Sequence, residues 1–297
     1  MKSTKPKPKI HVRKARASDR EVVFKFCKKT WSWGDYIPKV WNKWLKEKNG
    51  RVFIATIDGV PVGIAHLSID KPHEVWLSGA RTDPNYRRIG VATAITKKCL
   101  DYAKRKAAKV ARLTTESDNT AAQAVIKKLG FKPTAEFAEM TTEKIAGETS
   151  KNSKWAEKTD INDTWGYLQT SETYRKASGL YTVLFHWFSL EKQDLKRFIE
   201  QRKTILHLSK TNKIDGIMLI DDITAQEWHE NTIQTCYIDG DFNAAFDMTR
   251  FLKSHCHALG IKKIYGFTYN HKPIITALEK LGFEQQETTE IVYEKKI

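Results

Sequence analysis

Residues 87–92, Arg-Arg-Ile-Gly-Val-Ala, combine two arginines with a glycine. They follow an apolar run, residues 75–82, that predicts a β-strand, and a helical pattern begins at Gly90. The backbone N–H groups at a helix start and the positive end of the helix dipole bind anions, and the two arginines would add positive charge. The chemistry that suits this arrangement is the binding of a diphosphate. Taken alone, the same residues could equally form a strand-to-helix turn with two solvated arginines.

A second motif lies further along the chain. Residues 119–122, Asn-Thr-Ala-Ala, open a helical pattern that ends in residues 127–131, Lys-Lys-Leu-Gly-Phe. The two motifs, in this order and at this distance, resemble the GNAT superfamily of acetyl-CoA-dependent N-acetyltransferases. The first motif matches the family's pyrophosphate loop, Gln/Arg-x-x-Gly-x-Gly/Ala, and the second matches its next strand–helix unit. The resemblance covers residues 10–141.

The resemblance implies that acetyl-CoA is the acyl donor and that no metal takes part. In the family, the cofactor pyrophosphate lies on the backbone of the glycine loop, and the pantetheine arm pairs with the end of the fourth strand. The motif asparagine lies near the amides of that arm, and a side chain at Gly90 would collide with phosphate. The residues implied for cofactor binding are Ala80, Arg81, Thr82, Arg87, Arg88, Ile89, Gly90, Val91, Ala92, Thr93 and Asn119.

Acetyl transfer needs a general base, because a protonated amine has no lone pair with which to attack. Many family members place a glutamate on or near the fourth strand. The candidates here are Glu74 and Glu116, with Asp35 and His66 as further alternatives, and each could instead be an ordinary surface or capping group. Family members often carry a tyrosine that protonates the leaving thiolate, but this chain has Ile126 at that position. Either the thiolate leaves without that acid, or another residue serves, or the domain is not catalytic.

Trp33, Asp35 and Tyr36 begin an aromatic-rich segment that resembles the acceptor side of histidine N-acetyltransferase-like proteins. Those proteins also pair a GNAT domain with a divergent C-terminal domain. The resemblance implies a free amino acid or a similar small amine as the acceptor, with these three residues in substrate binding. The alternative is that the aromatic side chains simply belong to the core.

The second half of the chain repeats the order of elements in the first: a hairpin, a helix, a strand, an asparagine, and a helix that ends in Lys-Leu-Gly-Phe. This self-similarity predicts an α/β (α+β) protein with two tandem GNAT-like domains, each a mixed, mostly antiparallel sheet flanked by helices. The loop that corresponds to residues 87–92 holds Asp239 and Asp241 and no arginine. Because two carboxylates repel a diphosphate, the second domain is expected not to bind the cofactor.

The expected domain boundaries are a basic disordered arm at residues 1–9, a cofactor-binding domain at 10–141, a linker at 142–164 and a divergent domain at 165–297. In the first domain we expect strands at 10–17, 51–57, 60–69, 75–82, 110–115 and 131–140, with an Asp58-Gly59 turn joining the second and third. We also expect a capping box at 18–21 and helices at 36–48, 90–106 and 119–129. In the second we expect strands at 204–209 and 217–220 joined by an Asp215-Gly216 turn, a helix at 242–259 and a strand at 262–268.

The 297 residues, 40% hydrophobic and 29% charged, have the composition of a soluble globular protein, and no apolar run approaches the ~20 residues that span a bilayer. The formal net charge of +16 predicts attraction to polyanions, although no RRM, KH or zinc-finger signature supports nucleic acid as the partner. The cysteines Cys27, Cys99, Cys236 and Cys256 are too widely spaced for a metal site. They indicate reduced thiols and a cytoplasmic location.

These observations predict an N-acetyltransferase that moves the acetyl group of acetyl-CoA to a primary amine, on a small molecule or a peptide, by direct attack. The alternative hypothesis is a non-catalytic GNAT-fold module whose basic surface binds nucleic acid or an acidic protein partner. The sequence leaves the acceptor and the oligomeric state open.

Overall fold

The computed structural model describes residues 8–28, 30–31, 34–224 and 229–297. The chain forms two compact units. Unit 1 comprises Met1–Thr114, Thr120–Lys132 and Tyr293–Ile297, and unit 2 comprises Thr115–Asn119 and Pro133–Val292. Residues 133–141, which were expected to close the first domain, therefore group with unit 2, and the end of the chain groups with unit 1.

Unit 1 is built on a sheet whose strands follow one another in chain order. These strands are β1 (His11–Lys14), β2 (Gly50–Ile57), β3 (Val60–Lys71), β4 (Glu74–Thr82) and β5 (Val110–Glu116). Neighbours from β1 to β4 are antiparallel, whereas β4 and β5 are parallel. The predicted Asp58-Gly59 turn between β2 and β3 is present, with positive φ values of 49° and 81° that suit a two-residue hairpin.

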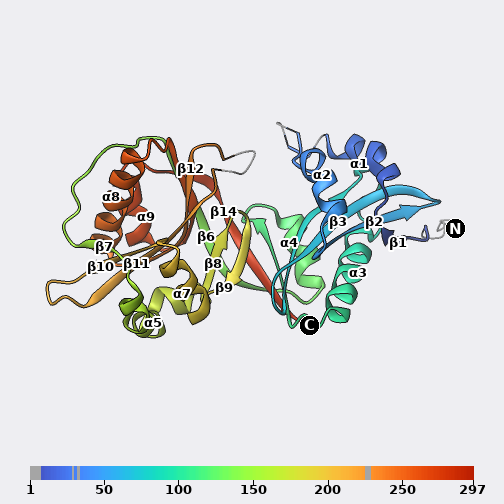
Figure 1. Ribbon diagram of the computed structural model, residues 1–297. Helices are drawn as coiled ribbons and strands as arrows, with labels where there is room; N and C mark the ends of the chain where they lie inside the picture. Colours follow the sequence, from blue (N-terminus) through green and yellow to red (C-terminus); the bar gives the residue numbers. More distant parts are fainter. Residues whose placement is uncertain (1–7, 29, 32–33, 225–228) are drawn as a thin grey trace. The chain divides into compact units, whose positions relative to one another are not determined.

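Helices cover both faces of this sheet (Figure 1). The helices α1 (Arg20–Cys27) and α2 (Ile37–Lys46) lie over one face, where they share a core with Val52, Ile54 and Ile64. Helix α3 (Val91–Arg105) covers the opposite face, because Val91 packs on Gly63 and successive residues of a strand point to opposite sides. Helix α4 spans Thr120–Lys128.

The start of α1 differs from the predicted capping box at residues 18–21. A short 3-10 turn, η1 (Ala17–Asp19), precedes the helix, and the Asp19 carboxylate accepts the backbone N–H of Arg16 at 2.7 Å. Arg13 also donates two bonds to Asp19, so this aspartate fastens the helix start to β1.

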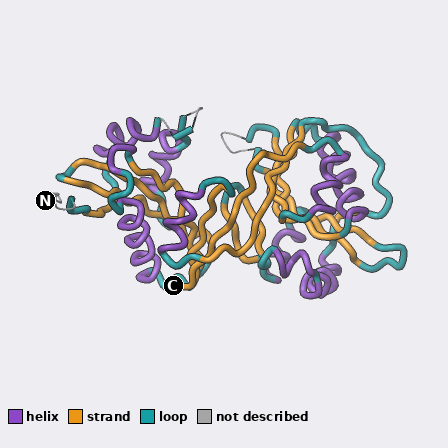
Figure 2. The backbone as a smooth tube through the Cα atoms, turned by 180° about the vertical axis from the view of Figure 1, so that it is seen from behind, coloured by secondary structure: helices purple, strands orange, loops and turns teal. Residues whose placement is uncertain are grey.

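The strands that lie chiefly in unit 2 are also mixed in direction (Figure 2). These strands, in spatial order, are β14 (Glu284–Lys296), β6 (Lys132–Thr142), β13 (Lys263–Tyr269), β12 (Thr232–Gly240), β11 (Ile214–Asp222), β10 (Thr204–Leu208) and β7 (Ser153–Trp155). The pair β12–β13 is parallel, as β4–β5 is in unit 1, and the pairs from β12 to β7 and between β13 and β6 are antiparallel. A separate hairpin consists of β8 (Leu180–Val183) and β9 (His186–Ser189).

Both faces of the sheet formed by these strands are buried. Met218 and Ile220 of β11 pack with α8 (Phe242–Ala258) and α9 (Lys272–Lys280), whereas Ile217 and Leu219 pack with α5 (Ile161–Thr170) and α7 (Lys192–Glu200). The short helices α6 (Glu172–Lys176), η2 (Pro84–Tyr86) and η3 (Lys158–Asp160) complete the described elements. Mixed, mostly antiparallel strands flanked by helices in both units confirm the predicted fold class.

The two units share an order of elements, with β3-β4-α3-β5-α4 in one and β11-β12-α8-β13-α9 in the other. One predicted turn in the second half is wrong, because Asp215 and Gly216 lie inside β11. Gly216 is needed there for close packing, since a Cβ on it would stand 2.8 Å from the Cβ of Ala244. The segment expected to be a linker contains β7, which pairs with β10, so it is partly structured.

Candidate functional site

The loop before α3 has the geometry of an anion site. Arg88 and Gly90 have positive φ values of 65° and 102°, and Gly90 is the N-cap of α3 with no side-chain cap. The first N–H groups of a helix have no partner within it, so those of α3 can bind a ligand. Arg87 and Arg88 are exposed beside them. Glycine at position 90 is required by the left-handed backbone conformation. Crowding does not require it, because a Cβ there would meet only the Cδ1 of Ile10 at 4.0 Å.

Gly63 of β3 sets the position of this helix start. A Cβ on Gly63 would stand 2.6 Å from the Cγ1 of Val91 and 3.2 Å from the carbonyl oxygen of Arg81. The first residue of α3 therefore rests directly on β3, next to the end of β4. Val91 itself is buried, with 2% of its surface exposed. This contact fixes the anion loop relative to the last residues of β4.

The parallel strands β4 and β5 are paired over only part of their length. Their register covers Glu74 to Trp76 against Val110 to Arg112 and ends there. Among the described residues, positions 77–82 of β4 have no strand partner on the β5 side. Their backbone N–H and C=O groups on that side can therefore pair with an extended ligand, at the end of β4 that leads into the anion loop.

A β-bulge interrupts β4 in this unpaired stretch. Ile64 pairs with Arg81, but His66 pairs with Ser78, so β4 has one residue more than β3 between the two pairs. Gly79 lies in the bulge with φ 60°, and a Cβ on it would stand 2.6 Å from the Cη2 of Trp44. Because Ile64 and His66 share one face of the sheet, the bulge places their partners Arg81 and Ser78 on that same face.

His66 is the centre of a hydrogen-bonded chain on this face. Its Nε2 lies 2.7 Å from Oε2 of Glu47, and its Nδ1 lies 3.1 Å from Oγ of Ser78. An ionised Glu47 accepts the Nε2 proton, so the assigned tautomer leaves Nδ1 to accept from the Ser78 hydroxyl. The ring is 2% exposed and stacks on Trp44 at 4.2 Å between centroids. Gly50 permits this approach, because a Cβ there would stand 2.9 Å from His66 Nε2.

Arg81 anchors the other end of the same face. Its Nε donates to Oδ2 of Asp35 at 2.7 Å, and its guanidinium lies over Trp31 at 4.3 Å and over Tyr36 at 5.5 Å. The Asp35 side chain is fully buried, and its Oδ1 accepts the N–H of Ile37 at 3.0 Å. Burial raises the pKa of the Tyr36 hydroxyl, and the Arg81 charge opposes part of that rise. Tyr36 stays neutral and donates or accepts only as a phenol.

The structure does not bring Glu74 to this site. Glu74 begins β4 and its carboxylate is 2.6 Å from Nη1 of Arg112, which also donates to Glu294 at 2.9 Å. The anion loop follows the opposite end of β4, roughly 26 Å away at 3.3 Å per residue. Glu74 is thus one of two carboxylates that balance a buried arginine.

The remaining predicted positions lie elsewhere. Glu116 ends β5 and groups with unit 2. There its negative charge adds to the effect of burial in raising the pKa of Glu139, and the charge of Lys263 lowers that pKa in part. Asn119 also groups with unit 2 and donates its backbone N–H to Glu116 at 3.1 Å. Ile126, at the family's tyrosine position, is a buried residue of α4. Trp33 lies outside the described residues.

Three residues of the candidate site were not predicted from the sequence: Trp31, Glu47 and Ser78. A lone glycine inside a strand pattern indicates a bulge, so Gly79 was the available signal for the neighbourhood of Ser78. The partners of that bulge come from α2 and the segment before it, and no local pattern joins these segments to β4.

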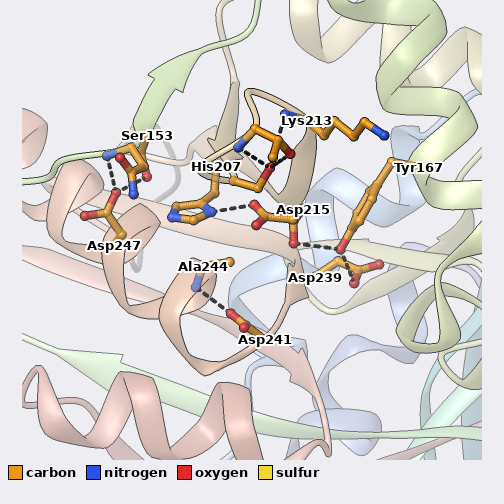
Figure 3. A network of polar contacts seen from close by, with 12 residues as sticks. Ser153, Tyr167, His207, Lys213, Asp215, Asp239, Asp241, Ala244 and Asp247 are labelled. Atoms are coloured by element: carbon orange, nitrogen blue, oxygen red, sulfur yellow. Dashed lines mark hydrogen bonds and ion pairs between the residues drawn. The ribbon is translucent and has the colours of Figure 1, made fainter.

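Unit 2 closes the corresponding helix start with its own side chains (Figure 3). Oδ1 of Asp241 accepts the N–H of Ala244 at 2.8 Å and caps α8. Asp239 is 2% exposed and accepts hydroxyl bonds from Tyr167, Ser171 and Tyr237. A carboxylate thus occupies the place that an anion would need, and a second lies two residues away.

Two kinds of feature are absent from the described part of the chain. No group of three or more His, Cys, Asp or Glu side chains there is arranged to hold a metal ion. In the same residues, no helix combines the length and the apolar character required to cross a membrane.

The start of α3 has no side-chain cap and lies beside β4 and β5, two parallel strands that are paired over only part of their length. This arrangement suits a long ligand that carries an anionic group. Residues 20–131 match the model of the acetyltransferase (GNAT) family. This part of the chain is therefore similar to that family, in agreement with the resemblance that the sequence motifs indicated.

The matches between this chain and its curated relatives cover only part of each relative's length. Over 107 residues the chain is 27% identical to an uncharacterized N-acetyltransferase of Methanocaldococcus jannaschii, covering 32% of this chain and 47% of that protein. Over 85 residues it is 32% identical to histidine N-acetyltransferase of Xenopus tropicalis, covering 28% of this chain and 26% of that protein. The matches thus span about half and about a quarter of these two proteins.

A solved structure resembles nearly the whole chain. The crystal structure of a GCN5-related N-acetyltransferase from Sphaerobacter thermophilus aligns with 97% of this chain and 95% of its own, with a TM-score of 0.62. The sequences are 9% identical over that alignment, so the likeness is one of fold.

Proposed function

We propose that this protein transfers the acetyl group of acetyl-CoA to a primary amine, and that unit 1 binds the acyl donor. The observation that carries the proposal is the parting of β4 and β5 after Trp76 and Arg112, next to the uncapped start of α3. An extended thioester arm needs backbone partners along one edge, and its diphosphate needs N–H groups and positive charge at the end of that edge. Unit 1 supplies both in sequence along β4 and the loop.

The arm of acetyl-CoA would pair with the backbone of Ala80, Arg81 and Thr82. Its pyrophosphate would accept from the backbone N–H groups between Arg88 and Thr93, with Arg87 adding charge. The family resemblance implied Asn119 as a further contact for the arm, but Asn119 groups with unit 2 and is not part of the site proposed in unit 1.

The amine acceptor would lie on the face of β4 that carries Ser78. Its neutral nitrogen attacks the thioester carbonyl carbon, a C–N bond forms, and the C–S bond breaks to release CoA thiolate. The proton lost by the nitrogen passes to the Ser78 hydroxyl, while the Ser78 proton moves to Nδ1 of His66. Glu47 holds the Nε2 proton of His66 and stabilises the imidazolium that forms. This route gives the base role to His66 rather than to Glu74 or Glu116.

The second unit is proposed to be a divergent GNAT-like domain that does not bind the acyl donor, because Asp241 already caps α8. The shared element order supports tandem domains. Four buried, unpaired cysteines support a reducing compartment such as the cytoplasm. No feature of the site favours the alternative of a non-catalytic polyanion-binding module over acyl transfer.

Calorimetric titration with acetyl-CoA tests the placement of the donor. We expect one molecule bound per chain by the wild type and no binding by Gly90→Glu, which strains the loop and adds negative charge. Gly59→Glu is the matched control, since Gly59 also has positive φ in open space but lies in the β2–β3 turn. Full binding by Gly90→Glu, or equal loss in both variants, would place the donor elsewhere.

Release of CoA in a screen of primary amines tests the reaction itself. His66→Gln is expected to lower kcat by about 10²- to 10⁴-fold with acetyl-CoA affinity retained, because general-base catalysis contributes an effect of that size. Glu47→Gln should lower it less. A His66→Gln enzyme with wild-type kcat across the pH range would remove the histidine from the mechanism.

A further inference from the structure

One buried nitrogen on the β4 face that carries Ser78 has no hydrogen-bond acceptor of normal geometry among the described residues. It is Nη2 of Arg81, whose guanidinium also interacts with the Tyr36 hydroxyl. The other two nitrogens each donate one hydrogen bond, Nε to Asp35 and Nη1 to the carbonyl oxygen of Ala80 at 3.0 Å. A buried charged N–H without an acceptor costs more free energy than an ordinary hydrogen bond contributes, so native structures supply an acceptor for it.

The rest of the surroundings hold this guanidinium in one orientation. Asp35 is itself fixed by the N–H of Ile37, and the guanidinium carbon lies over the rings of Trp31 and Tyr36, 4.3 and 5.5 Å from their centroids. A planar arginine that is held on one edge and stacked on aromatic faces presents its remaining N–H groups in a fixed fork. Carboxylates and phosphates are the anions whose geometry matches that fork.

We propose that Nη2 of Arg81 binds the carboxylate of the amine acceptor, so that the acceptors are amines that also carry a carboxylate, free α-amino acids above all. The inference rests on the proposed acetyl transfer, which it deepens by naming the substrate class. Arg81 is the ligand contact, and Asp35, which the sequence suggested as an acceptor contact, is a positioning residue that aims it.

The spacing along β4 favours a compact acceptor. Ser78 and Arg81 pair with His66 and Ile64, which are two positions apart on β3, so the two side chains emerge about 7 Å apart on one face. An α-amino acid between them places its amine at the Ser78 hydroxyl and its carboxylate at Nη2. An amine without the carboxylate leaves Nη2 buried and unpaired, and the site rejects it for that reason.

Kinetics with matched acceptors test this assignment. The common L-amino acids and their primary amides are compared by CoA release, since each pair shares the amine and differs in the negative charge. A hydrogen bond to a charged group predicts a kcat/KM about 10- to 100-fold higher for the acid than for its amide. Arg81→Gln should bring this ratio close to one, and Arg81→Lys, which keeps a charge but lacks the fork, should lower it substantially.

Arg13→Gln is the matched control, because Arg13 forms a similar ion pair, with Asp19, in the same unit. It should keep the wild-type ratio of acid to amide. Equal use of acids and amides by the wild type, or an unchanged ratio in Arg81→Gln that still folds and binds CoA, overturns the proposal. Dipeptides with a free N-terminus should be poor acceptors, and their preference over free amino acids would also overturn it.

A binding readout separates this inference from the proposed reaction. N-acetylated amino acids and their amides are titrated against the protein saturated with CoA, and tryptophan fluorescence is followed because Trp31 lies against Arg81. Tighter binding of the acids, lost in Arg81→Gln, supports the carboxylate contact even if no amine is acetylated. Absence of acetylation with every amine counts against the proposed function, whereas equal binding of acids and amides counts against the Arg81 contact.

Discussion

The contact between Gly63 and Val91 gives a quantitative test of how the donor site is positioned. In Gly63→Ala the new Cβ would stand 2.6 Å from the Cγ1 of Val91, closer than carbon atoms approach without strain. The opposite side gives no relief, because the carbonyl oxygen of Arg81 would be 3.2 Å away. The start of α3, or the end of β4, must therefore shift by several tenths of an ångström.

Overpacking of this kind costs about 1–3 kcal/mol. If the structure relieves it by moving the helix start, the anion loop moves too, and the Kd for acetyl-CoA should rise by about 5- to 150-fold, since 1.4 kcal/mol is a factor of ten. If the strain is retained, the Tm should instead fall by several degrees. We expect a mixture of the two effects, measured by calorimetric titration and by thermal melting of the same preparation.

The double variant Gly63→Ala with Val91→Ala provides the control. It removes the methyl group that clashes, and the new Cβ fills part of the space that Val91 leaves. The acetyl-CoA affinity should return to within about threefold of wild type, so the two changes should be strongly non-additive. An unchanged Kd and Tm in Gly63→Ala, or simple additivity in the double variant, would refute the role of this contact.

Three further outcomes follow from particular side chains. Glu74→Gln should lower the Tm because it unbalances Arg112, yet leave kcat within about twofold; a large fall in kcat would return Glu74 to the mechanism. Burial raises the pKa of Asp247, but four bonds from residues 150–153 outweigh it and hold that pKa below its usual value. The contribution of Asp247 to the free energy of unfolding is therefore present above about pH 4 and lost in more acidic solution. Asp247→Asn should make the Tm fall less steeply as the pH is lowered, and an unchanged slope would contradict this. Burial raises the pKa of Cys99 to about 12, so a thiol reagent at pH 8 should label Cys99 only after unfolding.

Local patterns predicted most of the elements of unit 1. The helix at α3 and the strand pair β2–β3 came from periodicity and from the Asp58-Gly59 turn, signals that depend on residues close together in the chain. The predicted Asp215-Gly216 turn failed for an instructive reason. Gly216 is needed for close packing against Ala244 of α8. An Asp-Gly pair in the sequence looks the same whether the glycine is needed for packing or for a turn.

The candidate site divides in the same way. The anion loop at residues 87–92 is contiguous in sequence, and its glycine is required by its own φ, so local patterns indicated it once the motif at residues 119–131 was read with it. Glu74 was a candidate general base because it lies on the fourth strand. Its position at the start of β4, away from the loop, depends on the register with β5. His66 was one of several alternatives, and nothing near it in sequence singled it out.

The sequence by itself indicated the family that residues 20–131 match, and it suggested the donor and the loop proposed to hold its diphosphate, because these depend on short motifs with fixed backbone needs. Only the tertiary structure decided which side chains meet on the acceptor face. Glu47 and His66 are 19 residues apart, and Asp35 and Arg81 are 46 residues apart. They are brought together by the packing of α2 on the sheet and by one extra residue in β4. These contacts join elements that are far apart in the sequence, so no local pattern could predict them.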